Sequence, residues 1–277
     1  MRSNLDLAAL WDFNNPALSE QRFKAALAVA PGDDALILQT QIARSHGLRR
    51  DFSSARRLLV ELQPQLATAS AEARVRHALE WGRAHASARH LPEAIDDAAK
   101  AEARQAWQPA LALARVADLD DLAIDAIHMF AFIDTAPAQQ QHWAEQALAV
   151  VLASSQPAAQ RWEASVRHNL GYALEQQQQH GQSLQQFKQA LSLREQGNNA
   201  SATHVAGYMV ARSLRLLGRT DEALAMQQRL QRESETAGKP DPYVLDELAL
   251  LYRARGDVAQ ADAATEQARQ VRAAGGK

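Results

Sequence analysis

The chain has 277 residues, a formal net charge of −2 and a pI near 6.5, so no global charge favours nucleic acid or an anionic membrane as a partner. It contains no cysteine, which excludes disulfides, thiolate metal sites and a cysteine nucleophile. No apolar stretch reaches the roughly 18 residues of a membrane-spanning helix. The first residues also lack the apolar core of a signal peptide. We therefore expect a cytoplasmic protein.

Alanine, leucine, glutamine, glutamate and arginine dominate the composition, and all of them favour helices. No alternating apolar run is bounded by turn pairs such as Asn-Gly. The sequence therefore predicts an all-α fold.

A pattern recurs along the chain at intervals of close to forty residues. In each unit a helical run ends at a turn, and a small residue then opens a second helix. In chain order these small residues are Ser19, Ala55, Ala94, Ser183, Ala223 and Ala261. Their spacings of 36, 39, 89, 40 and 38 residues leave room for one more unit in the long gap. We expect this irregular fourth unit to hold one long helix across residues 108–135 and a second across 137–154.

The units differ in how complete the pattern is. The first unit shows only its later half, through Phe23, Ala26 and Pro31. Fuller versions cover residues 38–62, 77–101, 166–191, 204–230 and 242–268. They share a large apolar residue followed by a small one in the first helix, then a turn, then a small residue that opens the second helix. The position four residues further on holds the aromatic Phe187 in one unit but Leu59, Ala98, Gln227 and Thr265 in the others.

This arrangement resembles the tetratricopeptide repeat. The resemblance implies a right-handed α-α superhelix (a solenoid) of about seven helix–turn–helix repeats, with roughly 14 helices in all. We expect the whole of 1–277 to form one solenoid, grouped as residues 1–106, 107–156 and 157–272, with a frayed tail at 273–277. The middle group is the irregular fourth repeat or a bend.

The resemblance also implies a function. In this family the first helix of each repeat, helix A, lines a concave groove that receives a peptide or helix of a partner protein. The matching positions of this sequence are Arg44, Arg76, Arg83, His168, Asn169, Tyr172, Tyr208, Arg212, Arg215 and Arg253. Arginines there could bind the carboxylates of an acidic peptide, although surface arginines often only pair with a glutamate of their own helix. The family's chaperone-binding carboxylate clamp is not reproduced, because His168 and Met209 occupy two of its positions.

Catalytic patterns are absent from the sequence. There is no phosphate-binding glycine loop, dinucleotide fingerprint or nucleophile elbow. The pattern closest to a metal site is Asp118, Asp121, Asp125 and His128, for which a solvated acidic face is the favoured interpretation. Glu175 and the four glutamines after it are interpreted as a solvated helix end.

We therefore expect a non-catalytic scaffold without cofactor or metal that binds another protein or peptide, with an acidic partner as one candidate. Two alternatives stay open at this point. One is a regulatory sensor that binds a small peptide or acidic ligand in the groove. The other is an enzyme on a helical-repeat fold. The sequence does not give the oligomeric state.

Overall fold

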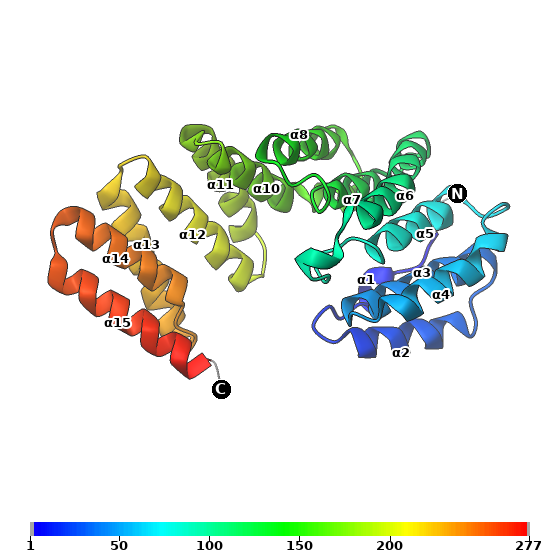
Figure 1. Ribbon diagram of the computed structural model, residues 1–277, viewed down its shortest axis with the longest axis horizontal. Helices are drawn as coiled ribbons and strands as arrows, with labels where there is room; N and C mark the ends of the chain where they lie inside the picture. The colour runs from blue at the N-terminus through cyan, green and yellow to red at the C-terminus, as the bar shows by residue number, and fades with distance from the viewer. Residues whose placement is uncertain (1–2, 276–277) are drawn as a thin grey trace. The chain divides into compact units, whose positions relative to one another are not determined.

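The computed structural model describes residues 3–275, which form α-helices joined by turns and contain no β-strand (Figure 1). Within each unit, most helices make the larger part of their contacts with the helices before and after them in the chain. The prediction of an all-α fold built from helix pairs is confirmed.

The described residues hold seven helix pairs, in agreement with the predicted number of repeats. The first four are α1 (Leu7–Leu10) with α2 (Pro16–Leu27), α3 (Gly32–Leu48) with α4 (Phe52–Leu62), α5 (Ala71–Arg83) with α6 (Asp97–Val116), and α7 (Asp120–Phe130) with α8 (Pro137–Ala153). A short helix, α9 (Pro157–Gln160), follows. The last three pairs are α10 (Glu163–Gln176) with α11 (His180–Glu195), α12 (Ala200–Leu216) with α13 (Thr220–Thr236), and α14 (Pro242–Arg255) with α15 (Val258–Gly275).

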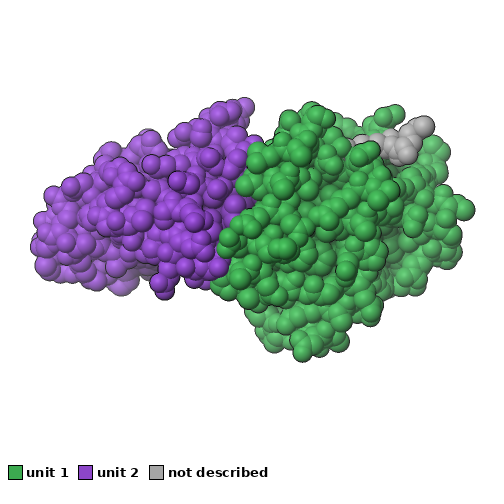
Figure 2. All heavy atoms as spheres, turned by 90° about the horizontal axis from the view of Figure 1, so that it is seen from above, with its two compact units in different colours: residues 1–162 green, residues 163–277 purple. Residues whose placement is uncertain are grey.

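The chain divides after Trp162 into two compact units, coloured separately in Figure 2. Unit 1 is residues 1–162 and contains α1 to α9, and unit 2 is residues 163–277 and contains α10 to α15. The grouping of the repeats into 1–106, 107–156 and 157–272 stays a prediction. Of the predicted frayed tail, residues 273–275 are helical, and 276 and 277 lie outside the described residues. No helix in the described part of the chain is both long and apolar enough to cross a membrane.

Small residues let the two helices of a pair approach closely. A Cβ atom on Gly82 of α5 would lie 2.1 Å from Nε1 of Trp107 in α6, and one on Gly171 of α10 would lie 2.8 Å from the Phe187 ring in α11. Both aromatic side chains are fully buried. Trp107 Nε1 also donates a hydrogen bond to the Leu79 carbonyl oxygen at 3.2 Å. Each glycine therefore makes room for the large side chain of the partner helix.

The predicted small residues that open the second helices are buried in five of the six units. They are Ser19, Ala55, Ser183, Ala223 and Ala261. Ser183 also donates a hydrogen bond from Oγ to the Gly171 carbonyl oxygen at 2.8 Å, which joins the two helices of its pair.

Ala94 was predicted to open the second helix of the third pair, and this is wrong. It is exposed and ends a single turn of 3₁₀-helix, Pro92–Ala94, in the segment between α5 and α6. The first buried small residue of α6 is Ala103, four positions before Trp107. The long connection between α5 and α6 displaces the second helix along the sequence and hides the regular spacing.

The single long helix predicted across 108–135 is also wrong. Helix α6 ends at Val116 and α7 begins at Asp120, whereas α8 agrees with the predicted helix across 137–154. In the turn between α6 and α7, Asp118 has a φ of +53°, and the Leu119 amide donates a hydrogen bond to the Ala114 carbonyl oxygen at 2.9 Å. A left-handed residue with a bond of this kind is a common way to end a helix.

Candidate functional site

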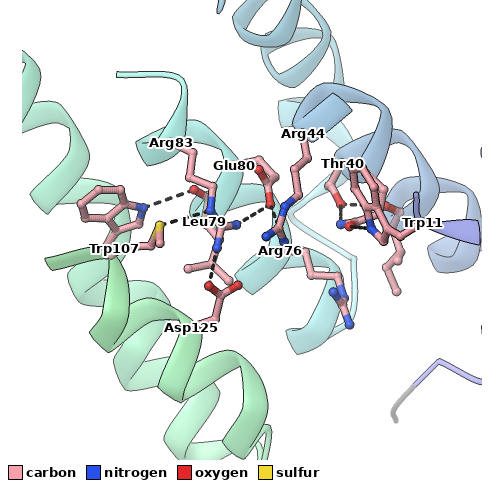
Figure 3. A network of polar contacts seen from close by, with 12 residues as sticks. Trp11, Thr40, Arg44, Arg76, Leu79, Glu80, Arg83, Trp107 and Asp125 are labelled. Atoms are coloured by element: carbon pink, nitrogen blue, oxygen red, sulfur yellow. Dashed lines mark hydrogen bonds and ion pairs between the residues drawn. The ribbon is translucent and has the colours of Figure 1, made fainter. Parts of the chain in front are cut away.

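The first helices of successive pairs in unit 1 contact one another, α3 with α5 and α5 with α7. Figure 3 shows polar side chains from all three helices converging. They are Arg44 of α3, Glu80 and Arg83 of α5, and Asp125 of α7, and we refer to these four residues as the ion network.

Arg83 is the centre of the ion network. Its two terminal nitrogens bind Glu80 and Asp125, and its Nε lies 3.1 Å from the sulfur of Met129. The side chains of Arg83, Glu80 and Asp125 are only 11%, 4% and 9% exposed. Arg44 is the outer member, 27% exposed and 3.8 Å from Glu80. The network therefore links three consecutive helix pairs through buried charges.

Electrostatics favour the charged forms of Arg83 and Asp125. Burial alone lowers the pKa of Arg83, but the attraction of Asp125 and Glu80 outweighs it and the pKa lies above its usual range. Burial raises the pKa of Asp125, yet Arg83 and Arg44 more than offset this, so the pKa lies below its usual 3.8. Arg44 differs, because burial and repulsion by Arg83 lower its pKa despite the nearby carboxylates. Glu80 and Asp125 therefore compensate its charge only in part.

A pocket of about 150 Å³ lies beside the ion network. Arg44, Glu80 and Arg83 contribute its polar side, together with Ser87 and Arg89 from the segment after α5. The rest of its wall is mainly apolar or small and comes from Ala43, Gly47, Leu48, Ala55, Ala84, Ala88, Met129 and Phe132. The arrangement offers a space for an apolar side chain with a guanidinium at its edge.

Three predicted groove residues of unit 2 also lie in a polar cluster. Arg212 of α12 is 3.0 Å from Glu175 of α10 and shares a hydrogen bond with Tyr208. Arg215 binds Glu247 of α14 through two hydrogen bonds of 2.6 and 2.9 Å. Glu175 and Glu247 are both buried. Here too the arginines join the first helices of neighbouring pairs.

The remaining predicted residues lie in different surroundings. Arg76 pairs with Glu72 of its own helix at 2.8 Å, and Arg253 lies 3.6 Å from Asp262 at the surface. His168 packs edge-on against Phe187 with 5.6 Å between ring centroids, and burial lowers its pKa. In α10, Tyr172 is exposed, while Asn169 is half-buried and has an interaction partner.

The sequence interpretation missed the acidic partners of the arginines. Glu175 is buried and paired, so its assignment to a solvated helix end is wrong. Asp125 is likewise buried and does not belong to a solvated acidic face. The pairs within one helix, such as Glu80 with Arg83, have a spacing that is visible in the sequence. The pairs between helices have no such signal. Among the described residues no group of three or more His, Asp or Glu side chains could hold a metal ion.

Comparison with known protein families identifies one of the helix pairs as a known repeat. Residues 164–196, which cover nearly all of α10 together with α11, match the family model of the tetratricopeptide repeat. The chain contains a tetratricopeptide repeat. No protein with curated annotation matches the sequence.

Several solved structures of tetratricopeptide repeat (TPR) proteins share the fold at low identity. A signal transduction ATPase with a TPR sensor from Pyrococcus horikoshii is 12% identical with a TM-score of 0.72, over 92% of this chain and 39% of that one. The apo form of RapI is 11% identical with a TM-score of 0.70, over 96% of this chain and 75% of that one. NprR in complex with its cognate peptide NprX is 11% identical with a TM-score of 0.51, over 97% and 79% of the two chains. The fold is therefore that of a TPR solenoid.

Proposed function

We propose that this TPR protein is a non-catalytic scaffold that binds a peptide or helix of a partner protein in the pocket beside the ion network. The observation that carries the proposal is the pocket itself, which combines a mainly apolar wall with the incompletely compensated charge of Arg44. Solenoid proteins commonly use such helix surfaces for binding. The structurally similar NprR was solved with a peptide bound, and a similar Rap protein with Competence and Sporulation Factor.

The chemistry of the pocket favours an apolar side chain next to a carboxylate. Glu80 is already bound by Arg83 and lies 3.8 Å from Arg44, beyond hydrogen-bonding distance. The guanidinium of Arg44 can therefore take up a further carboxylate, and a planar guanidinium binds that group through two hydrogen bonds. The carboxylates of Glu80 and Asp125 are held by Arg83 and do not supply a base for proton transfer. This supports binding rather than catalysis.

Gly47 offers a way to fill the pocket without disturbing the fold. It lies in α3, lines the pocket, and a Cβ atom added to it would meet nothing within 4 Å. A Gly47→Phe variant should therefore fold and occupy the space meant for a ligand side chain. Gly181 in α11 of unit 2 is the matched control, because a Cβ atom there also meets nothing within 4 Å.

The experiment starts with random peptides displayed on phage and selected on the intact chain. The affinities of the selected peptides are then measured by fluorescence anisotropy. We expect Gly47→Phe to weaken binding by about tenfold or more, which is about 1.4 kcal/mol, and Gly181→Phe to leave it unchanged. Selected peptides that bind Gly47→Phe as well as they bind the original chain would place the site elsewhere. Failure to select any peptide would argue against peptide binding altogether.

A further inference from the structure

Residues 3–13, here called the strap, take an unusual path across unit 1. The Ser3 amide donates a hydrogen bond to Glu72 of α5 at 2.8 Å, and its hydroxyl donates to Asp34 of α3 at 2.6 Å. Further along, Nε1 of Trp11 donates to Gln41 of α3 at 3.1 Å. Figure 1 shows this first part of the chain, in dark blue, running beside α3. The strap thus begins at the third helix pair and ends at the first.

This path breaks the rule that governs a repeat stack. In a solenoid each pair packs against its immediate neighbours. The strap precedes α2 and belongs to the first pair, so its contact with Glu72 of the third pair passes over α3 of the second. The strap therefore contacts the first helices of both the second and the third pair, α3 and α5. In solenoid proteins the surfaces of such helices commonly receive a ligand.

The contacts of the strap are those of a bound peptide. Leu5 and Leu7 pack against two of the buried apolar clusters to which α3 contributes, and Leu10 and Trp11 pack against one of these two. The guanidinium of Arg44 stacks over the rings of Trp11 and Phe13, 5.7 Å from each centroid. Apolar anchors joined to a few hydrogen bonds are typical of peptide recognition on a groove.

The strap packs against the core, but none of its own side chains is fully buried. None of residues 3–13 is buried, whereas Phe23 of α2 and the residues Ile37, Leu38 and Gln41 beneath the strap are. Its helix, α1, is a single turn of four residues with no buried side chain. A short segment of this kind contributes little helix stability of its own. It is held by the surface below, and a competing peptide could replace it.

We infer that the face of α3 and α5 beneath the strap is a peptide-binding surface, that the strap is its intramolecular occupant, and that the partner is a peptide with leucines followed by tryptophan. The inference deepens the proposed function, because it extends the binding surface beyond the pocket and names the chemistry of the partner. Arg44 connects the two parts. It lines the pocket and stacks on the strap, so a ligand carboxylate that draws it away weakens the hold on Trp11.

The test supplies the strap as a separate molecule. A peptide with the sequence of residues 3–15 carries a fluorophore at its carboxyl end and is titrated with the intact chain and with the Trp11→Ala variant. In the original chain the linked strap competes at a high effective concentration, of the order of millimolar. We expect the peptide to bind Trp11→Ala at least about tenfold more tightly than it binds the original chain. The same peptide with alanine in place of its tryptophan should bind neither.

Two further variants complete the test. Leu5→Ser weakens the contact of the strap at another point, so that Leu5→Ser and Trp11→Ala are two chains with a loosened strap. Circular dichroism shows which of these two variants keeps its helices. Adding Gln41→Ala to a loosened chain should weaken the peptide again, because Gln41 accepts the indole hydrogen bond. If a folded, loosened chain shows no saturable binding of the peptide, the inference is overturned.

The outcomes separate this inference from the proposed function. In one outcome the strap peptide binds a loosened chain, and the selected peptides bind Gly47→Phe as tightly as the original chain. This outcome supports a binding surface beneath the strap and contradicts a binding site in the pocket. The opposite pair of results supports the pocket and assigns the strap a purely structural role.

Discussion

At the residue scale the buried charges specify how neighbouring pairs align. A buried ion pair adds little net stability compared with apolar residues of the same size, because removing the charges from water costs about as much as their attraction returns. Removing one partner is different, since the other charge is then buried without compensation. Arg83 satisfies Glu80 of its own helix and Asp125 of the next pair. The network can close only when α5 and α7 are correctly aligned.

Asp125→Ala should therefore lower the free energy of unfolding by about 3 kcal/mol, since it leaves Arg83 buried and short of a counter-charge. Urea denaturation monitored by circular dichroism provides the measurement. Asp262→Ala is the control: its side chain is 68% exposed and 3.6 Å from Arg253, a surface pair that contributes less than about 1 kcal/mol. Equal losses in the two variants would contradict a structural role for the network.

The sequence singled out several arginines but did not reveal the carboxylates that pair with them. Arg44, Arg83 and Arg212 were predicted as ligand-binding residues from their positions in the repeats, and that assignment stays a prediction. Their carboxylate partners went unrecognised because periodicity reports which face of one helix a residue occupies. It contains no information on which residue of another helix lies opposite. Glu175, thirty-seven residues before Arg212, is an example.

At the element scale, two glycines within helices differ in whether packing requires them. Gly82 allows the Trp107 ring to lie directly on the α5 backbone, and a Cβ atom would come within 2.1 Å of that ring. Gly47 has open space around it and weakens α3 without any packing benefit. The same residue type is therefore required at one position and dispensable at the other.

Alanine substitution should give opposite signs at these two glycines. Gly82→Ala should destabilise the protein by about 1–3 kcal/mol, because the buried indole of Trp107 cannot move away without losing its hydrogen bond to Leu79. Gly47→Ala should stabilise it by about 0.5–1 kcal/mol, the difference in helix propensity. Thermal unfolding of both variants beside the original chain measures this. A gain in stability for Gly82→Ala would show that the close helix contact is not needed.

The turns explain why some helix ends were predictable and one was not. In four pairs the first helix is followed by a residue with a positive φ, namely Arg50, Gln178, Gly218 and Gly256, and Asp118 plays the same part after α6, the second helix of its pair. The next amide donates to a carbonyl oxygen five residues earlier in each case. Gly218 and Gly256 allow this turn to be predicted from the sequence, because glycine adopts a positive φ at no steric cost. Asp118 does not, and the turn between α6 and α7 was accordingly predicted as continuous helix.

At the scale of the whole chain, stability should vary from repeat to repeat. In a solenoid it is approximately the sum of the repeats' own stabilities and of the contacts between neighbours. Within unit 2, the last helix α15 buries only the alanines Ala261, Ala264 and Ala268, whereas α11 buries Leu184, Phe187 and Leu191. Less apolar area is removed from water at α15, so we expect the seventh pair to open more readily than the fifth.

A substitution at the turn of the seventh pair should consequently have only local effects. Gly256 ends α14 with a φ of +81°, and alanine in that conformation costs about 1–2 kcal/mol. We expect the amides of α14 and α15 in Gly256→Ala to exchange with deuterium roughly 5–30 times faster, the factor that corresponds to this free energy. Those of α3 and α5 should exchange at their original rates, because at least three repeats separate them from the change. Gly181→Ala, at a position without a positive φ, should alter none of them. Faster exchange in α3 and α5 as well would mean that the chain unfolds as one cooperative body, and that the nearest-neighbour description does not apply.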